Sequence, residues 1–465
     1  MTDRIESTLR RLGERMPERI SRPGDRSYDA ATAIWAQPVG RMPRAVAHCR
    51  TAEDVQSAIR AARDCDLPLS VRGGGHDWAG RALCDGLVID LGGMKSVSAN
   101  WENGAARIAG GARASDVVRE TDPLGLAPVT GAVGAVGMAG LTLGGGYGPL
   151  IGRFDLAVDN LLAAEVVLAD GRIVTAGPDS ETELFWALRG GGGNFGVVTL
   201  MYYRLHALPS VRSGMLIYPF TEAGAVLGHC AEIASSAPEE LTVQVGIVTA
   251  PPNGEPVVFV VPTWCGEPTE GEARVEPFLR LGTLLNGGVD RISYGASLSA
   301  FDAFVVNGRR TFMETCWLPS LDSAGVDAMI RAMATVVSPV RAIFTHEFKG
   351  AATGVPLETT AFGLRRGHVL VEILAAHADR SDEREKQHRQ WALAARHAFD
   401  AIALPGGYPN LLAGGDANRT AKSYGRNAER LVRAKRRYDP DNVFWSAIPL
   451  PVTRHDRSRL DQVNA

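Results

Sequence analysis

The stretch PRAVAHCRTAEDVQSAIRAARDCDLPLSVRGGGHDWAG (43–80) decides the fold of this chain. A capping box, TAED (51–54), opens a segment whose apolar residues recur at helical spacing. Short apolar runs follow at LPLSV (67–71) and GLVIDL (86–91), and each is typical of a buried strand. The pattern predicts a helix between strands, with the glycine-rich loop RGGGH (72–76) directly after a strand.

Three successive glycines in that loop can turn the chain and aim backbone N–H groups into one concave site. Such a nest binds a pyrophosphate without any side-chain charge. The spacing is not G-x-G-x-x-G and no Walker lysine follows, so neither a Rossmann fingerprint nor a P-loop is present. Taken alone, the loop is equally well interpreted as a flexible turn beside an exposed histidine. Further glycine clusters at 140–148 and 189–196 favour close approach of the backbone to a ligand.

The composition indicates a multidomain protein that acts on a small molecule. The chain has 465 residues, 45% of them hydrophobic, which is enough for two or three cores. A net charge of -3 argues against nucleic acid as a partner. The six cysteines form no CxxC pair and no cluster with histidines, which predicts reduced thiols without zinc or disulfides. We expect a cytoplasmic protein, because neither a signal peptide nor a membrane span is visible.

Further elements follow along the first 206 residues. ARIAGG (106–111) is predicted to be a strand, and Ser115 to cap the helix after it. AAEVVLADGRIVT (163–175) predicts a hairpin that turns at Asp-Gly, and VVTLMYYRLH (197–206) predicts another strand. A second capping box, from Ser180 to Glu183, precedes LFWAL.

Glycine becomes less frequent after residue 206, which predicts a second domain over 207–404. This region holds expected strands at 256–264 and 368–374 and an expected helix at 384–399. The remaining segment, 405–465, contains a predicted helix through RNAERLVRAKRRY.

Four ordered motifs resemble those of one family. The 43–80 stretch is similar to the FAD-binding signature of the vanillyl-alcohol-oxidase superfamily, which has a PCMH-type FAD-binding domain, and specifically of its berberine-bridge-enzyme-like branch. Segments 130–162 and 183–199 resemble the later flavin-contact segments of that branch, and 408–412 with 424–444 resemble its C-terminal segment that covers the flavin. The resemblance implies an α+β fold: a two-part PCMH-type FAD-binding domain over 1–206, an inserted substrate domain over 207–404 with an antiparallel sheet backed by helices, and a C-terminal segment over 405–465 that returns to the FAD domain.

The same resemblance implies FAD as the cofactor and assigns its contacts. His76 takes the place of the family's flavin-attachment histidine, which implies a bond to the C8 methyl group of the isoalloxazine. The phosphate loop falls on Arg72 through Asp77. The residues implied in FAD binding are Arg72, Gly73, Gly74, Gly75, His76, Asp77, Gly80, Thr130, Gly131, Gly137, Gly140, Gly196, Val198, Tyr408 and Asn410.

The sequence departs from the family pattern at several places. Many members carry a second flavin bond, from a cysteine at the position that Val133 occupies here, so we predict one covalent bond. A tyrosine base found in some sugar and plant oxidases is replaced by Leu411, which disfavours a carbohydrate oxidase. The segment FWSAIPLP (444–451) lacks the family's terminal asparagine, and Asp155 replaces a usual glycine.

Two residues are predicted to be catalytic. Glu347, in HEFKG (346–350), is the expected general base, because a carboxylate in a dry cavity can have a raised pKa. The alternative is a strand glutamate that faces solvent or pairs with a nearby cation. Strand alternation places His346 on the face opposite Glu347. Tyr147 either donates a hydrogen bond to substrate or packs on the glycine backbone.

Other residues are given structural roles. Glu372 is interpreted as an ordinary strand residue, because one face of its strand is expected to meet water. Four aromatic residues either line a pocket or belong to the core: Trp264, Trp317, Phe312 and Phe344.

The resemblance implies an FAD-linked oxidase with a small organic substrate. Hydride leaves a C–H bond next to oxygen or nitrogen, a base takes the accompanying proton, and O2 reoxidises the flavin to give H2O2. Natural-product tailoring and amine or alkaloid catabolism, including nicotine-type oxidation, fit the monocovalent pattern. The alternatives are a flavin-bearing drug-binding or resistance protein with little turnover, a dehydrogenase, or a monooxygenase. We expect no nucleic-acid or membrane partner, and either a monomer or a homodimer.

Overall fold

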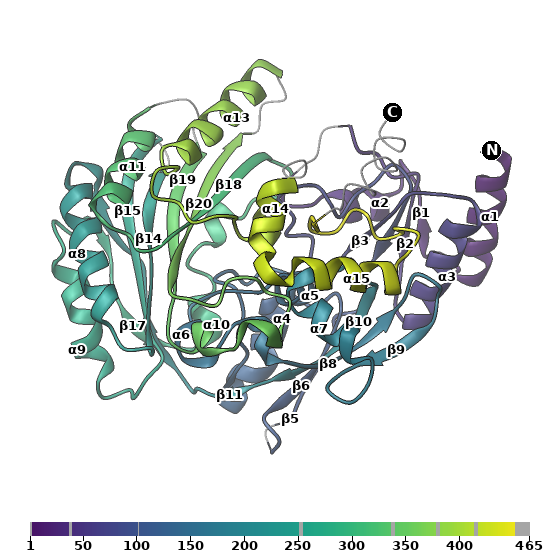
Figure 1. The fold of residues 1–465 in the computed structure, drawn as a ribbon, viewed down its shortest axis with the longest axis horizontal. Helices are drawn as coiled ribbons and strands as arrows, with labels where there is room; N and C mark the ends of the chain where they lie inside the picture. Colours follow the sequence, from purple (N-terminus) through teal and green to yellow (C-terminus); the bar gives the residue numbers. More distant parts are fainter. Residues whose placement is uncertain are drawn as a thin grey trace.

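The computed structural model describes residues 2–36, 40–100, 102–250, 254–335, 340–377, 382–412 and 417–451. Three sheets of four or more strands organise the chain, beside one two-stranded sheet (Figure 1). Two smaller sheets lie in the N-terminal part, and a large sheet lies in the middle of the sequence. The chain thus has the α+β organisation that the sequence predicts.

The first sheet contains the segment that begins at residue 43. Its strand order is β1-β2-β4-β3, and β2, β4 and β3 are parallel. Helix α3 connects β2 to β3, and its predicted capping box between Thr51 and Asp54 is present. The bounds are β1 Ile20–Ser21, β2 Ala45–His48, α3 Ala52–Asp64, β3 Leu69–Arg72 and β4 Leu87–Asp90, with α1 Thr2–Arg15 and α2 Arg26–Thr32 before them.

The second sheet is antiparallel, with strand order β5-β6-β10-β8-β9. The predicted hairpin forms between β8 and β9, and Gly171 in its turn has φ +83°. The two helix caps predicted in this region were wrong. Ser115 lies inside α4, whose N-cap residue is Arg113, and α7 begins after Glu181 without a side-chain cap. The bounds are β5 Val97–Asn100, β6 Ala105–Ala109, α4 Ala114–Thr121, β7 Leu126–Ala127, α5 Met138–Leu143, α6 Ile151–Phe154, β8 Leu161–Val167, β9 Ile173–Ala176, α7 Thr182–Gly191 and β10 Val197–Arg204.

The third sheet has nine strands and is antiparallel throughout. Its main path runs β16-β13-β15-β14-β19-β20-β18, and β12 and β17 lie off this path. The bounds are β11 His206–Ala207, which pairs with β7, and then β12 Val211–Ser213, β13 Leu216–Pro219, β14 Leu241–Ala250, β15 Glu255–Trp264, β16 Asn286–Gly287, β17 Asp290–Ile292, β18 Arg310–Leu318, β19 Val340–Phe348 and β20 His368–His377.

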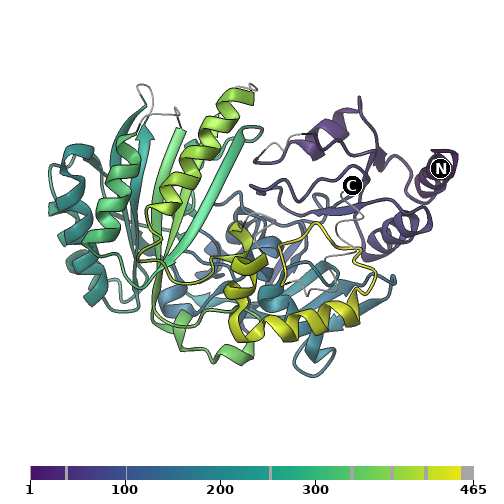
Figure 2. The same cartoon turned by 45° about the horizontal axis from the view of Figure 1, so that its top comes forward.

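Helices cover only one face of this sheet, so its opposite face turns toward the N-terminal part of the molecule (Figures 1 and 2). The covered face carries a buried apolar core that includes Cys230 of α8, Ile343 of β19 and Trp391 of α13. The helices of the middle region are α8 Ala223–Ser236, α9 Gly271–Val275, α10 Tyr294–Ser297, α11 Ser323–Ala334, α12 Ala351–Gly354 and α13 Asp382–His397.

The C-terminal segment returns from the large sheet to the N-terminal part (Figure 2). Helices α14 Ala417–Tyr424 and α15 Ala428–Tyr438 are drawn in yellow there. Leu431 of α15 packs in the same core as Leu184 of α7, which fixes the return. No helix in the described part of the chain is long and apolar enough to cross a bilayer. All six cysteines are free and buried.

Candidate active site

A cavity of about 630 Å³ lies between the glycine-rich loops and the uncovered face of the large sheet. Residues of the first two sheets and of the C-terminal segment form one wall, which we call the glycine wall. Residues of β13, β14, β15, β18, β19 and β20 form the other, which we call the sheet wall. The two walls have different chemistry.

Close backbone contacts shape the glycine wall. A Cβ atom on Gly74 would lie 2.4 Å from the Cα of Gly137, so the two loops touch where neither has a side chain. At Gly140 and Gly193, in contrast, a Cβ atom would meet no protein atom within 4 Å and would enter the cavity. Open space beside bare backbone suits a ligand that lies directly on the chain.

His76 lies in the cavity wall with its ring stacked on Trp35, at 4.6 Å between ring centroids and an interplanar angle of 14°. Burial, with a smaller contribution from the positive charge of Arg113, lowers the pKa of His76 to about 4. Arg113 is itself held by a hydrogen bond from its Nε to the carbonyl of Gly74. The imidazole is therefore neutral at pH 7, with a ring nitrogen able to act as a nucleophile.

The C-terminal segment is tied to the loop that carries His76. Trp78 Nε1 and Arg81 both donate to the carbonyl of Asn410, and Arg81 also donates to the carbonyl of Leu412. The Asn410 side chain in turn donates to the carbonyl of Gly140, at 3.0 Å. These bonds join three separate parts of the sequence around one end of the cavity.

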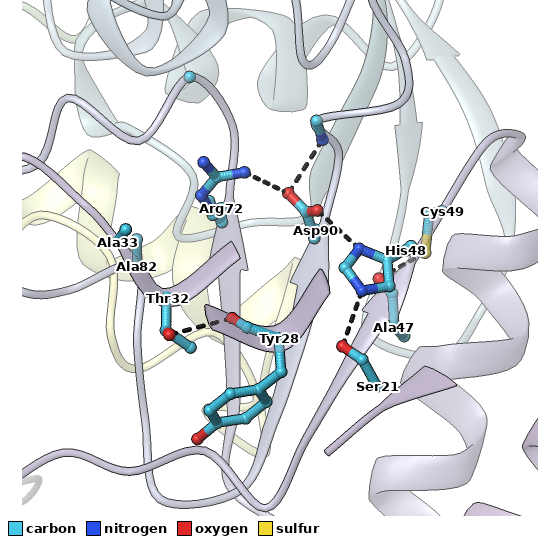
Figure 3. Close-up of polar contacts among 12 residues, drawn as sticks. Ser21, Tyr28, Thr32, Ala33, Ala47, His48, Cys49, Arg72, Ala82 and Asp90 are labelled. Carbon is cyan, nitrogen blue, oxygen red and sulfur yellow. Dashed lines mark hydrogen bonds and ion pairs between the residues drawn. The ribbon is translucent and has the colours of Figure 1, made fainter. Parts of the chain in front are cut away.

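A buried polar network holds Arg72 behind the glycine loop (Figure 3). Asp90 accepts from Arg72 at 2.7 Å and lies 3.0 Å from His48 Nδ1, and His48 Nε2 lies 2.8 Å from Ser21 Oγ. Burial alone would raise the pKa of Asp90, but the hydrogen bond from His48 and the charge and hydrogen bond of Arg72 outweigh it and lower that pKa. The order Ser21–His48–Asp90 resembles a hydrolase triad, but Ser21 is 3% exposed and lies outside the cavity. The network therefore anchors the loop.

Polar residues gather at one end of the sheet wall. Tyr147 donates to Glu372 Oε1 at 2.6 Å, and His346 Nε2 lies 3.1 Å from the same oxygen. The amide nitrogen of Gln244 lies 3.3 Å from His346 Nε2. Within the described residues, Glu372 Oε2 has no hydrogen-bond partner, so that oxygen remains for a ligand. Burial and the neighbouring Glu372 raise the pKa of Tyr147 well above its usual value, so its phenol stays a donor.

The prediction for Glu347 was wrong in its geometry. Glu347 lies on the helix-covered face of β19, does not line the cavity and pairs with Lys349 at 3.2 Å. Burial raises the pKa of Glu347, but the carboxylate is separated from the cavity by the sheet. His346 is on the opposite face, as alternation predicts, and that face is the cavity face.

The structure brings most of the other predicted residues to the cavity. Three assigned to FAD contact lie behind its wall instead: Arg72 is held by Asp90, Gly80 is buried in the loop, and Thr130 is hydrogen-bonded to Tyr294. Those that line the cavity are Gly73, Gly74, Gly75, His76, Asp77, Gly131, Gly137, Gly140, Tyr147, Gly196, Val198, Tyr408 and Asn410.

Sequence reasoning missed Glu372, His346 and Gln244 as site residues. The available signal was Glu372 itself, a lone charge inside the apolar run HVLVEIL, since an unpaired charge is rarely buried without a function. Of the four aromatic residues considered for the pocket, only Phe344 lines it, and Trp264 and Trp317 belong to the core.

These features fit FAD. The glycine wall offers bare backbone for a pyrophosphate, and His76 is a neutral nucleophile at its edge. Val133 lines the same cavity, so no thiol is available at that position.

Comparison with known proteins agrees with this fit. Residues 43–177 match the family described as "FAD binding domain", and residues 401–451 match "Berberine and berberine like". The chain is 40% identical to (R)-6-hydroxynicotine oxidase of Paenarthrobacter nicotinovorans over 210 residues, which is 45% of each chain. It is 29% identical to FAD-linked oxidoreductase hasG of Aspergillus fumigatus, over 92% of this chain and 96% of that one.

The crystal structure of 6-hydroxy-D-nicotine oxidase from Arthrobacter nicotinovorans superposes with a TM-score of 0.80 at 28% identity, covering 91% of this chain and 96% of that chain. Fold, cavity and matches together define an FAD-linked oxidoreductase. Within that class, the chain is similar to the berberine-bridge-enzyme-like PCMH-type flavoproteins, as the four motifs imply.

Proposed function

We propose that this protein is an oxidase of a small organic substrate and that a single covalent bond, at His76, holds its FAD. When bound, FAD accepts a hydride from a C–H bond next to oxygen or nitrogen and passes the two electrons to O2, which gives H2O2. The observation that carries the proposal is the Tyr147–Glu372–His346 cluster in a cavity that His76 also lines.

Glu372 is the proposed base. Its Oε1 is held by Tyr147 and lies beside His346, so the carboxylate is fixed in the cavity wall. A positioned carboxylate takes the proton of a substrate O–H or N–H group as the neighbouring C–H bond breaks. Tyr147, which remains protonated, orients Glu372 and does not compete for that proton.

His76 is proposed to hold the cofactor through a ring nitrogen. Stacking on Trp35 fixes the plane of the imidazole, and its low pKa keeps the ring neutral. A fixed, neutral nucleophile favours bond formation because little ordering is needed at the moment of reaction. Val133 supplies no second attachment point, which supports one bond.

The test is an anaerobic reduction with a panel of aryl alcohols, amines and sugars. Loss of the flavin absorbance near 450 nm, a general property of flavins, reports hydride transfer; its return with peroxide after air is admitted identifies an oxidase. Reduction that air does not reverse would make the protein a dehydrogenase. No reduction by any member of a broad panel would favour a binding protein with little turnover.

A further inference from the structure

The sheet wall is polar at one end and apolar along its middle. Gln244, His346 and Glu372 occupy neighbouring strands at the polar end. One cross-strand row lies two residues beyond Glu372 and four residues beyond Gln244 and His346. It contains only apolar side chains: Val257, Val248, Ala342, Leu374 and Met313. The strand register therefore builds a continuous apolar floor that begins beside the proposed base.

The segment from Phe301 to Arg309 covers this floor. Phe301 packs on Phe259 at 5.6 Å between ring centroids, and Phe304 belongs to the same apolar cluster. The far end of the segment is fixed to the N-terminal part, where Gly308 N donates to the carbonyl of Ile34 at 3.1 Å. The cavity beside the floor is thus roofed by aromatic and aliphatic side chains.

A cation closes the apolar region. Arg309 lines the cavity, as do Thr311 and Met313 of the same strand edge. Within the described residues, the Arg309 side chain has no hydrogen bond or ion pair, whereas the next residue, Arg310, pairs with Glu385 at 2.5 Å. Thr315 is the partner of Glu372 and lies six positions after Arg309. At about 3.3 Å per residue, the two ends are roughly 20 Å apart along the sheet.

We propose that the substrate is an extended, largely apolar molecule with one anionic group, a carboxylate or its equivalent, that pairs with Arg309 while the oxidised carbon lies beside Glu372. This inference rests on the proposed function for the position of the oxidised carbon. A planar guanidinium binds a carboxylate through two parallel hydrogen bonds, and this is the strongest polar contact that the outer part of the cavity offers.

The same walls exclude sugars. A sugar presents hydroxyl groups on every side, and each one placed against the apolar floor would lose its hydrogen bonds to water without replacement. The apolar row offers no replacement for those bonds, and the polar end of the sheet wall suffices for a single alcohol or amine.

The test is calorimetric binding to the flavin-loaded protein, with ω-phenylalkanoates of increasing chain length and their uncharged primary amides as probes. We expect affinity to rise with chain length until the chain spans the cavity, and the acid to bind about tenfold more tightly than its amide. Arg309→Met should abolish this preference for the acid, and Arg309→Lys should retain part of it. Arg310→Met is the matched control and should leave the preference unchanged.

Equal binding of acid and amide by the unaltered protein would overturn the assignment of Arg309, as would an acid preference that survives Arg309→Met. Binding of a disaccharide in place of the apolar probes would overturn the substrate class. Binding needs no turnover, so a protein that prefers the acids but is reduced by no substrate would contradict the proposed oxidase and leave this inference intact.

Discussion

The two walls of the cavity are built by different means. The glycine wall is made of backbone that comes close because side chains are missing, as at Gly74 and Gly137. The sheet wall is made of side chains that alternate along registered strands, so each residue faces either the cavity or the helices. The first wall suits a cofactor common to many relatives, and the second sets what is oxidised.

The largest expected effect is on kcat, and it tests which of the two glutamates, Glu372 or Glu347, faces the cavity. Glu372→Gln removes the proposed base and should lower kcat roughly 10²- to 10⁴-fold. Glu347→Gln alters a carboxylate on the opposite face and should leave kcat unchanged. Flavin reduction in single turnovers with a substrate from the panel measures both. Equal losses in the two variants would contradict the assignment.

The pH dependence of flavin attachment tests the glycine wall. Because the neutral imidazole is the nucleophile, the attachment rate should stay constant as the pH falls through 6.5, the usual His pKa. It should fall only as the pH approaches the His76 pKa of about 4. The measurement adds FAD to flavin-free protein at a series of pH values, each checked for folding by circular dichroism. A midpoint near 6.5 would mean that the imidazole is exposed to water.

Two glycine substitutions distinguish glycines that allow close backbone packing from glycines that leave space for a ligand. Gly74→Val places atoms against the Gly137 backbone, so we expect the free energy of unfolding to fall by about 2–3 kcal/mol. Gly140→Val meets no protein atom and should change the free energy of unfolding by less than about 1 kcal/mol, yet it should reduce FAD binding. Denaturant unfolding of the flavin-free proteins and their flavin content measure the two effects. Full FAD binding by Gly140→Val would place the cofactor elsewhere.

The smallest effect concerns Asp155, which replaces the glycine that the family resemblance implies at this position. It has φ +62° and ψ −178°, a conformation that costs a residue with a side chain about 1 kcal/mol or more. Asp155→Gly should therefore raise the free energy of unfolding by about 1 kcal/mol. Asp66→Gly, at φ +53° outside the site, is the matched control and should show a similar gain. A loss in the Asp155 variant would indicate that its carboxylate has a stabilising contact.

The glycine wall was largely predictable from sequence, because its function depends on runs of one residue type at fixed places. Gly73 to His76, Gly137 and Gly140 line the cavity as the motifs implied. Local capping signals were less reliable: Thr51 caps α3, but Ser115 and Ser180 do not cap their helices. Arg113 and Glu181 occupy the N-cap positions, within two residues of the predicted ones.

The sheet wall could not be predicted in the same way. Glu347 and Glu372 are both glutamates in apolar strands, and only the register of β19 and β20 decides which one meets the cavity. A shift of one residue in the register of a strand moves each of its side chains to the other face of the sheet. A sequence-based prediction that is wrong by one position therefore places the wrong glutamate in the cavity. The domain boundaries at residues 206 and 404 remain predictions. The position of the large sheet and of the C-terminal segment is compatible with them but does not define them to the residue.

The central claim is that His76 alone holds the flavin. The direct measurement is acid precipitation of the purified protein, followed by mass spectrometry of its flavin-bearing peptide, with His76→Ala beside it and His48→Ala as the control histidine. Attachment at His76 predicts a yellow pellet with flavin on the His76 peptide alone, kept in His48→Ala and lost in His76→Ala. Flavin released into the supernatant from the unaltered protein, or flavin on any other peptide, would contradict it.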